Sequence, residues 1–315
     1  MPVGYLLARV GMFLLVIWLA ASIIFVIPRI ARGSPVQSQA AQERFGLDRP
    51  IAEQYGSYLL DALRLDLGPS IVYFPSDVAR HIQMRLPWSI GLLAISSTAA
   101  FILGNLLGAI LGWSGAPRRL RMLTPLLMPL MAIPYYLLGL ILVFLFSFTW
   151  PIFPPGGGYS MATNVELSPA FVIDVIHHGT LPAISILLAS VGFWTITMRA
   201  MMITNLDDDY MIMSEAKGLA PMRIFFRYAM RNAMLPQITM MAITFGQIVS
   251  GSLLVEVIFD YPGIGWILRE AIRHNDYALI QGIGFVLVLA VAGAMLILDL
   301  LTPLVDRRIV YGRRS

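Results

Sequence analysis

Residues 209–220 read Asp-Tyr-Met-Ile-Met-Ser-Glu-Ala-Lys-Gly-Leu-Ala, and Arg223, Arg227 and Arg231 follow at a spacing of four. This polar segment lies between long runs that are too apolar for a water-soluble domain. Charged side chains are costly in hydrocarbon, so in a membrane protein such a segment must face water or another protein. The sequence therefore predicts a membrane protein with a polar, helical segment outside the bilayer.

The composition supports this prediction. The chain has 315 residues, of which 58% are hydrophobic and 13% are charged, whereas a soluble domain carries about a quarter charged residues. The mean hydropathy is +0.76. The chain has no cysteine, which excludes disulfides, thiolate metal sites and cysteine nucleophiles.

Six apolar stretches are long enough to cross a bilayer as helices. A helix is expected because it satisfies the hydrogen bonds of its own backbone N–H and C=O groups in lipid. They cover residues 10–27, 89–113, 122–150, 175–198, 232–255 and 277–298, and three prolines predict a kink in the third. The predicted organisation is a first helix in residues 1–28, an external segment in 29–88, a five-helix core in 89–305 with a cytoplasmic loop at 204–232, and a basic tail in 306–315.

Arginine placement predicts the orientation. The loops at 118–121 and 199–231 and the tail are basic, whereas residues 151–174 hold no arginine or lysine. The positive-inside rule then puts both termini in the cytoplasm, and the long 29–85 loop crosses despite its arginines. The net charge of +4 follows from this topology, so nucleic-acid binding is not expected. The external segment is expected to form one or two short amphipathic helices, with an apolar pattern at Tyr55, Leu59, Leu60 and Leu63.

The 204–232 loop resembles the cytoplasmic coupling loop of ABC importer permeases, on the basis of Glu215-Ala216-Lys217-Gly218 and the closing Leu235-Pro236. The chain resembles most specifically the dipeptide and oligopeptide branch of that family. The motifs that carry this resemblance are residues 45–50 (Phe-Gly-Leu-Asp-Arg-Pro), Gln54-Tyr55, Asp66-Leu67-Gly68-Pro69-Ser70, Gly246, Gly251, 255–265, Asp276-Tyr277, Asp299 and Asp306. The sequence departs from the family at Ser34, where aspartate is usual, and at Arg307, where proline is usual.

The resemblance covers roughly the whole chain and implies an all-α, six-helix type I ABC importer permease of the bacterial or archaeal inner membrane. It implies a heterodimer in which this chain forms half of the translocation pathway, together with a second homologous permease, two ABC ATPase subunits and an external solute-binding protein. No Gly-rich phosphate-binding loop occurs, and the only lysine precedes Gly218. ATP and Mg are therefore expected in the ATPases, with no cofactor, metal or catalytic residue in this chain, which is not itself an enzyme.

The coupling loop is expected to form a short helix at about 207–217, a turn at Gly218 and a second helix at about 221–230, because glycine suits a helix C-terminus and proline a first turn. The resemblance implies that this structure sits in a groove of the ATPase. The predicted coupling residues are Tyr210, Glu215, Ala216, Lys217, Gly218, Arg223 and Arg227. The alternative is an interfacial helix whose arginines contact lipid phosphate.

A second candidate site is the outer segment, residues 259–266, where a proline and two glycines interrupt the helical pattern. It is interpreted as a gate or as a contact for the binding protein, against the alternative of a simple turn with interfacial aromatics. The residues concerned are Phe259, Tyr261, Pro262, Gly263, Gly265 and Trp266.

Other features have ordinary explanations. Gly104, Gly108 and Gly112 form a stripe at which another helix can approach closely. The adjacent His177 and His178 cannot share one helix face, so a structural role is preferred to a metal site.

The predicted cargo is a di- or oligopeptide, with oligosaccharides as the main alternative and nickel chelates or glutathione also open. A stand-alone secondary carrier or channel is a further alternative, whereas a membrane hydrolase has no supporting constellation of residues.

Overall fold

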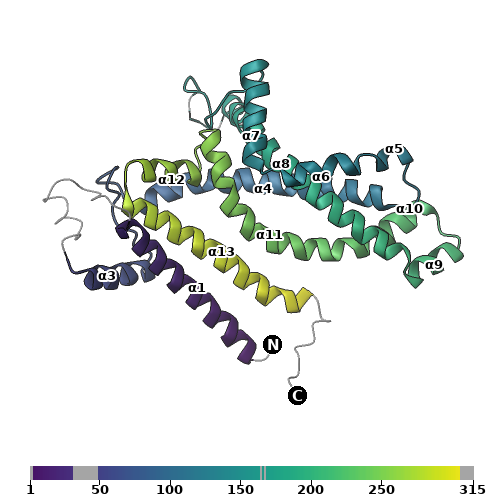
Figure 1. Cartoon of the computed structure of the whole chain (residues 1–315), viewed down its shortest axis with the longest axis horizontal. Helices are drawn as coiled ribbons and strands as arrows, with labels where there is room; N and C mark the ends of the chain where they lie inside the picture. The colour runs from purple at the N-terminus through teal and green to yellow at the C-terminus, as the bar shows by residue number, and fades with distance from the viewer. Residues whose placement is uncertain (1–2, 31–48, 164, 167, 306–315) are drawn as a thin grey trace. The chain divides into compact units, whose positions relative to one another are not determined.

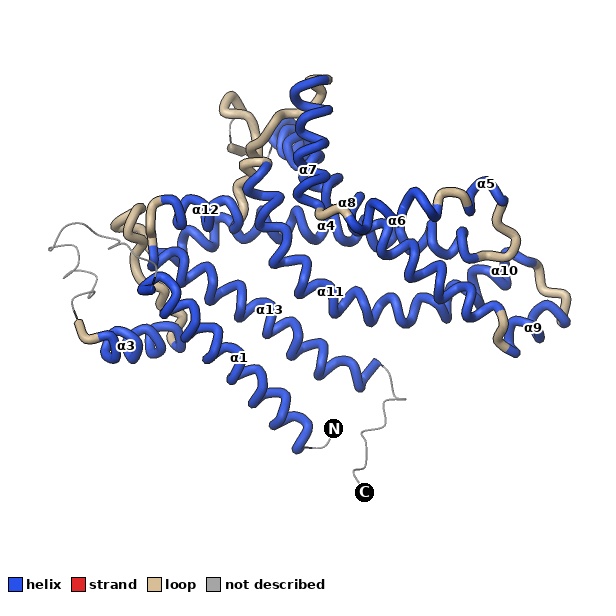
Figure 2. The backbone as a smooth tube through the Cα atoms, viewed as in Figure 1, coloured by secondary structure: helices blue, strands red, loops and turns tan. Residues whose placement is uncertain are grey.

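The computed structural model describes residues 3–30, 49–163, 165–166 and 168–305 (Figure 1). Within these residues every extended regular element is a helix, joined by loops (Figure 2), which confirms the all-α prediction. The basic tail, Ser34 and residues 45–48 of the family motif lie outside the described residues, as do the side chains of Gly246 and Gly251.

The helices are α1 (Val3–Ile30), α3 (Ile51–Leu63), α4 (Val78–Gly112), α5 (Arg118–Arg121), α6 (Thr124–Ala132), α7 (Tyr135–Val143), the π-helix η1 (Phe144–Thr149), α8 (Pro169–Leu206), α9 (Asp209–Ala216), α10 (Pro221–Ile224), the π-helix η2 (Phe225–Met230), α11 (Arg231–Ile258), α12 (Ile264–Arg273) and α13 (Tyr277–Val305).

Four of the described helices are long and apolar enough to cross a membrane, namely α1, α4, α8 and α13. The α6 and α7–η1 pair forms a fifth candidate, with a bend of 99° between its two parts. We expected one kinked helix here. The structure instead breaks at Ile133, whose extended ψ of 120° fits the restriction that Pro134 places on the preceding residue. Helix α11 occupies the position of the fifth predicted span, and part of it lies outside the described side chains.

The chain divides into two compact units, Met1–Pro87 with Gly263–Ser315, and Trp88–Pro262. In the first unit α1 packs along α13, and α3 packs against α1 (Figure 1). The ring of Phe25 lies 5.2 Å from that of Tyr55 and 5.4 Å from that of Tyr58. The buried side chains of Ala21, Ala62 and Phe285 form the core of this contact, so α3 is held on α1 and α13 by apolar packing.

Asp276 organises the start of α13 in the first unit. Its carboxylate accepts the backbone N–H groups of Leu279 and Val72, each at 3.0 Å, and also the hydroxyl of Ser70. The aspartate therefore caps α13 and fixes the turn after α3 at the same time. This contact joins the Ser70 and Asp276 motifs, which lie 206 residues apart in the sequence.

In the second unit α8 is the central helix, with α6, α7 and α11 packed on it. The glycine stripe of α4 also lies on α8. A Cβ atom at Gly108 would come within 2.7 Å of the Cβ of Met198, and one at Gly112 within 2.6 Å of the Cβ of Met202. These approaches confirm that the stripe serves helix packing.

Candidate coupling and outer sites

The coupling segment, residues 204–232, begins where α8 ends and turns sharply after α9. The backbone N–H of Gly218 donates to the carbonyl of Glu215 at 2.9 Å, and that of Leu219 to the carbonyl of Ser214 at 3.3 Å. Gly218 has a φ of +67°. This pair of bonds around a left-handed residue is a Schellman motif, which confirms the predicted turn.

The second helix of the segment is confirmed as well. Pro221 opens α10, and the N–H of Arg223 donates to the carbonyl of Ala220 at 2.8 Å. The helix continues through η2 into α11. The π-helical geometry of η2 was not predicted, since nothing in the apolar spacing distinguishes it from an α-helix. Such π segments occur often at functional sites.

Buried apolar side chains anchor the coupling segment to the ends of α4 and α8. Met211, Ile224 and Phe225 are exposed by 1%, 3% and 7%, and they pack in one cluster with Met198 and Met202. The ring of Phe225 also meets that of Trp113 at 5.4 Å, edge to face. A force on the segment would therefore be transmitted directly to two membrane helices, because close-packed interiors deform little.

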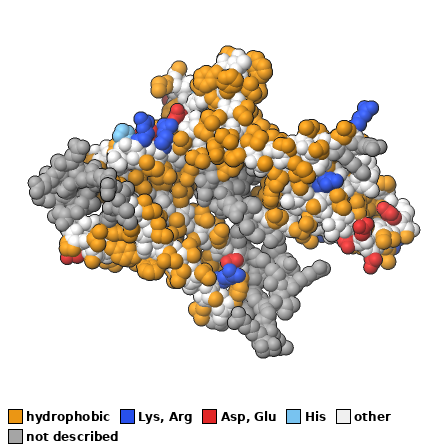
Figure 3. Space-filling view, in the orientation of Figure 1, with side chains coloured by type: hydrophobic (Ala, Val, Ile, Leu, Met, Phe, Trp, Pro, Cys, Tyr) orange, Lys and Arg blue, Asp and Glu red, His pale blue; other side chains and the backbone are white. Residues whose placement is uncertain are grey.

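The opposite side of the segment is exposed and strongly polar. Glu215, Lys217 and Gly218 face solvent, as do Ala216, Arg223 and Arg227. Exposed aspartates at positions 207–209 add negative charge, and acidic side chains gather over α9 in Figure 3. The predicted coupling residues other than Tyr210 thus lie on the surface of the same segment.

Sequence reasoning missed the apolar part of this surface. Ile212 and Met213 on α9 are exposed by 60% and 59%, and Met222 and Phe226 by 66% and 54%. Periodicity alone does not show it, because it does not tell which side of α9 packs inward. In the structure Met211 and Ser214 are buried, so their neighbours point outward. Exposed apolar groups among charges are typical of a protein contact.

Tyr210 differs from the other predicted coupling residues. Its side chain is half-buried and its hydroxyl lies beside Asn232 and Asp208, and burial is the main cause that raises the pKa of the phenol. The hydroxyl is buried and has no hydrogen-bond partner among the described residues, so the side chain packs within the segment. Its geometry favours positioning of α9 over direct contact with a partner.

The outer segment starts with the same hydrogen-bond motif in a different setting. The N–H of Tyr261 donates to the carbonyl of Glu256 at 2.8 Å, and that of Asp260 to the carbonyl of Val257 at 3.4 Å. The left-handed residue is Asp260, with a φ of +44°. Gly263 has a φ of −94° and a ψ of −168°, an extended conformation open to any residue. The helix break is therefore at Asp260, and the glycine and proline signals gave its place only approximately.

A glycine-rich loop covers the first part of the outer segment. The N–H of Gly157 donates to the carbonyl of Phe259 at 2.8 Å. A Cβ at Gly156 would lie 3.0 Å from the carbonyl carbon of Phe259, and one at Gly158 2.8 Å from the Cδ of Pro262. The loop follows the segment closely because its residues lack side chains.

Aromatic packing completes this contact. Phe259 and Tyr261 are exposed by only 1% and 5%. The ring of Trp88 meets that of Tyr261 at 5.7 Å and that of Tyr159 at 6.1 Å. Burial, and secondly the carboxylate of Glu256, raise the pKa of Tyr261 to about 12. Core positions of this kind favour a gate or a structural turn over direct contact with an external protein.

The remaining outer-segment residues belong to the first unit. Gly263 and Gly265 are buried, and Trp266 is half-buried on α12. The guanidinium of Arg85 lies 4.7 Å from the centre of the Trp266 ring, a cation–π contact.

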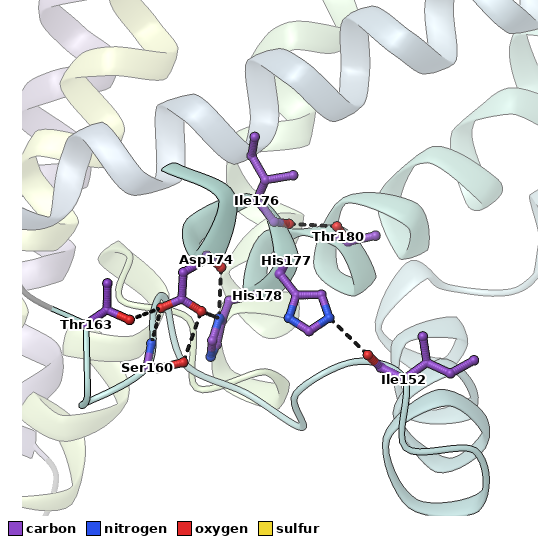
Figure 4. A network of polar contacts seen from close by, with 8 residues as sticks. All are labelled: Ile152, Ser160, Thr163, Asp174, Ile176, His177, His178 and Thr180. Carbon is purple, nitrogen blue, oxygen red and sulfur yellow. Dashed lines mark hydrogen bonds and ion pairs between the residues drawn. The ribbon is translucent and has the colours of Figure 1, made fainter. Parts of the chain in front are cut away.

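His177 and His178 each have a structural partner (Figure 4). The Nε2 atom of His177 lies 2.9 Å from the carbonyl oxygen of Ile152. His178 Nδ1 lies 3.2 Å from the Asp174 carboxylate, which accepts bonds from Ser160 N–H at 2.7 Å and Thr163 Oγ1 at 2.9 Å. His177 and Asp174 thus fasten the loop after η1 to the start of α8. No cluster of three metal-ligating side chains occurs in the part of the chain that the structure describes.

Comparison with known proteins identifies the family. The family described as binding-protein-dependent transport system inner membrane component matches residues 104–311. The chain belongs to this family. It is 28% identical to the dipeptide transport system permease protein DppB of Lactococcus lactis subsp. cremoris, over 98% of this chain and 99% of the relative. It is 30% identical to the oligopeptide transport system permease protein AppB of Bacillus subtilis, with the same coverage. A glutathione transport system permease protein of Pectobacterium atrosepticum is 28% identical over 92% of this chain and 93% of the relative.

Family membership confirms the predicted resemblance and the ABC permease role, and it favours a component of a binding-protein-dependent system over a stand-alone carrier. Together with the apolar helices it makes the chain a multi-pass protein of the cytoplasmic membrane. The roles of the individual coupling and outer residues stay predictions.

Proposed function

We propose that this chain is one half of the membrane domain of an ATP-driven importer for di- or oligopeptides. The support for the cargo is that full-length relatives are named as dipeptide and oligopeptide permeases. The glutathione permease among the relatives is compatible with this class, because glutathione is itself a peptide. Oligosaccharide transport has no such support.

The observation that carries the proposal is the construction of the coupling segment. Its exposed side combines charges of both signs with the apolar side chains of Ile212 and Met213. Its buried side is packed on α4 and α8 through Met211 and Phe225. A partner bound to the exposed side of the segment would move the membrane helices when it moves. We infer that this partner is an ABC ATPase, which binds ATP and Mg, and that this chain supplies no catalytic group.

The arrangement requires the coupling segment to face the cytoplasm, with both termini on the same side. The arginine distribution supports this orientation. The complete transporter would contain a second, homologous permease, two ATPases and an external binding protein that delivers the peptide. ATP-driven closure of the ATPases would then switch the pathway between inward-facing and outward-facing states.

Site-directed crosslinking tests the partner. Because the chain has no cysteine, single cysteines can be placed without background. Met213→Cys, on the exposed side of α9, should crosslink to the ATPase, and crosslinking should change when ATP is added. Met161→Cys, at a fully exposed position on the loop before α8, is the matched control and should give no ATPase product. Crosslinking from the control alone would refute the assignment of the coupling surface.

Transport by the assembled complex tests the cargo. Proteoliposomes that contain both permeases, both ATPases and the binding protein should accumulate a labelled dipeptide only when ATP is supplied on the ATPase side. Accumulation of an oligosaccharide but no peptide would refute the cargo class without touching the coupling result. Uptake by this chain alone, driven by an ion gradient, would refute the importer proposal itself.

A further inference from the structure

The first unit contains a cavity that neither the coupling segment nor the outer segment uses. Its volume is about 250 Å³, and it lies between α3, the turn that follows α3, and the first turns of α13. Leu67 and Phe285 supply apolar wall, and Arg49, Asp61, Asp66 and Gln281 supply polar groups. Several of these residues belong to the external motifs whose purpose the transport proposal leaves unexplained.

The polar groups suit a ligand with charges of both signs. The carboxylates of Asp61 and Asp66 outnumber the single guanidinium of Arg49 in the lining, so the cavity attracts a cation and retains one donor for an anion. The Gln281 amide adds a second donor, since its Nε2 atom is buried without a hydrogen-bond partner among the described residues. A buried donor of this kind is costly unless a ligand or water meets it. An ammonium and a phosphate joined by a short linker carry charges complementary to these groups.

The size of the cavity agrees with such a ligand. One buried water needs about 10–15 Å³ of such space, so a cavity of about 250 Å³ has room for a group of several non-hydrogen atoms. A phosphoethanolamine group is a ligand of this size class.

The surface beside the cavity indicates that the ligand comes from the membrane. Leu60 and Leu63 of α3 are exposed by 57% and 83%, and Leu65 in the following turn by 60%. The buried side of α3 is formed by other residues, among them Ala62. Leucines left outside on an amphipathic helix are typical of insertion at a bilayer surface. The same short element therefore presents apolar groups to acyl chains and charged groups to a headgroup.

We propose that this cavity binds the headgroup of an amine-bearing zwitterionic phospholipid, of the phosphatidylethanolamine type. Its ammonium pairs with Asp61 and Asp66, its phosphate with Arg49 and the Gln281 amide, and its acyl chains lie along the exposed leucines. Bound lipid links α3 to the outer end of α13 and so stabilises the external helix. This inference stands apart from the proposed cargo and the ATPase contact.

The test compares lipids on the purified full transporter in detergent. The thermal unfolding midpoint is measured during titration with phosphatidylethanolamine, phosphatidylcholine or phosphatidylglycerol. Phosphatidylethanolamine should raise the midpoint at the lowest concentration, because only its ammonium offers N–H donors to the carboxylates. In the double variant Asp61→Asn with Asp66→Asn its apparent affinity should fall roughly tenfold or more, the effect expected from losing a charged hydrogen bond. Glu53→Gln, on α3 but outside the cavity lining, should keep the parent affinity.

The quantity compared is the ratio of the apparent affinities for two lipids within one variant. Because this ratio does not depend on basal stability, each result supports or overturns the proposal. Equal responses to phosphatidylethanolamine and phosphatidylcholine in the parent would overturn the proposal. So would an undiminished preference in the double variant, or a preference for phosphatidylglycerol. Full stabilisation by soluble glycerophosphoethanolamine would overturn the assignment to a lipid, as would stabilisation only by the external binding protein.

Discussion

The coupling segment and the outer segment end their helices with the same pair of backbone hydrogen bonds, yet one is open and the other is enclosed. At the end of α9 the left-handed residue is Gly218, and a Cβ there would have nothing within 4 Å. At the end of α11 it is Asp260, followed by Tyr261, which is exposed by 5%. The first turn is shaped by its own sequence, whereas the second is held by neighbours distant in the chain.

This difference separates two kinds of mechanical role. A turn that stands free can present its side chains to a partner without rearrangement. An enclosed turn can move only if the glycine loop at 156–158 and the aromatic rings around Trp88 move with it. The coupling segment is thus suited to contact with a partner and the outer segment to a gate or a static turn, and substitutions at each should fail in different ways.

The largest expected difference is in the accessibility of positions on the two sides of the membrane to a thiol reagent. A membrane-impermeant thiol reagent added to intact cells should label Ser57→Cys and Met161→Cys, whose side chains are exposed, and leave Ala220→Cys unlabelled until the membrane is opened. The expected result is all or none, because the reagent does not cross the bilayer. Labelling of Ala220→Cys in sealed cells, or protection of both other positions, would show that the predicted orientation is wrong.

Gly156→Val should produce the largest loss of folded protein. Any side chain at this position would meet the backbone of Phe259, at 3.0 Å for its carbonyl carbon, and a backbone atom cannot rotate away. Overpacking of this kind costs about 1–3 kcal/mol and occasionally more. The yield of assembled complex and its unfolding midpoint measure the effect. Gly179→Ala is the control, since its Cβ would lie 4.0 Å from the Tyr261 ring.

Normal assembly of Gly156→Val would show that the loop is not held against the outer segment. The outer turn would then not be enclosed by the loop at 156–158.

Much of the fold could be predicted because lipid imposes strong rules on sequence. Length and polarity gave the long helices, and Gly218 with Pro221 gave both the turn and the second helix of the coupling segment. The glycine stripe of α4 was also recognisable, because small residues at this spacing permit close helix approach.

The parts that could not be predicted depend on contacts between distant residues. Nothing near Asp260 in the sequence shows that it takes a left-handed conformation, since the bond from Gly157 to Phe259 joins two loops about a hundred positions apart. The break at Ile133 is local, but a proline permits either a kink or a complete turn, and packing decides which. The exposure of Ile212 and Met213 likewise follows from which side of α9 is packed.

Gly218→Val should abolish or strongly reduce transport while the complex still assembles. Valine resists a positive φ, at a cost of about 1–2 kcal/mol, and the turn at this position has open space around it. The expected consequence is a misdirected α9 and loss of contact with the ATPase. Gly218→Asn is the matched control, because asparagine tolerates this conformation. Binding-protein-stimulated ATP turnover per assembled complex is the measurement, and coupled transport at the parent rate by the valine variant would refute the role of this turn.

Glu215→Arg should have a milder effect at the same surface. Glu215 is exposed, so reversal of its charge leaves the packing of the segment intact and changes only its interaction with a partner. We expect a partial loss of transport that grows at low ionic strength, where screening is weakest. A loss that is equal at low and high salt would point to a structural cause instead.

The smallest effect is expected at Gly263, a position that tests whether the outer segment is a gate. Its φ of −94° and ψ of −168° accept a side chain, so a substitution does not fail through backbone strain. Gly263→Ala, together with the larger Gly263→Val, therefore tests motion of the segment more than its conformation.

If the outer segment moves during the cycle, basal and binding-protein-stimulated ATPase rates per assembled complex should diverge from the parent while assembly is unchanged. If it is a static turn, the buried position should make the valine variant lose assembled protein, with normal rates in what remains. Normal assembly together with normal rates in both variants would remove the segment from the mechanism.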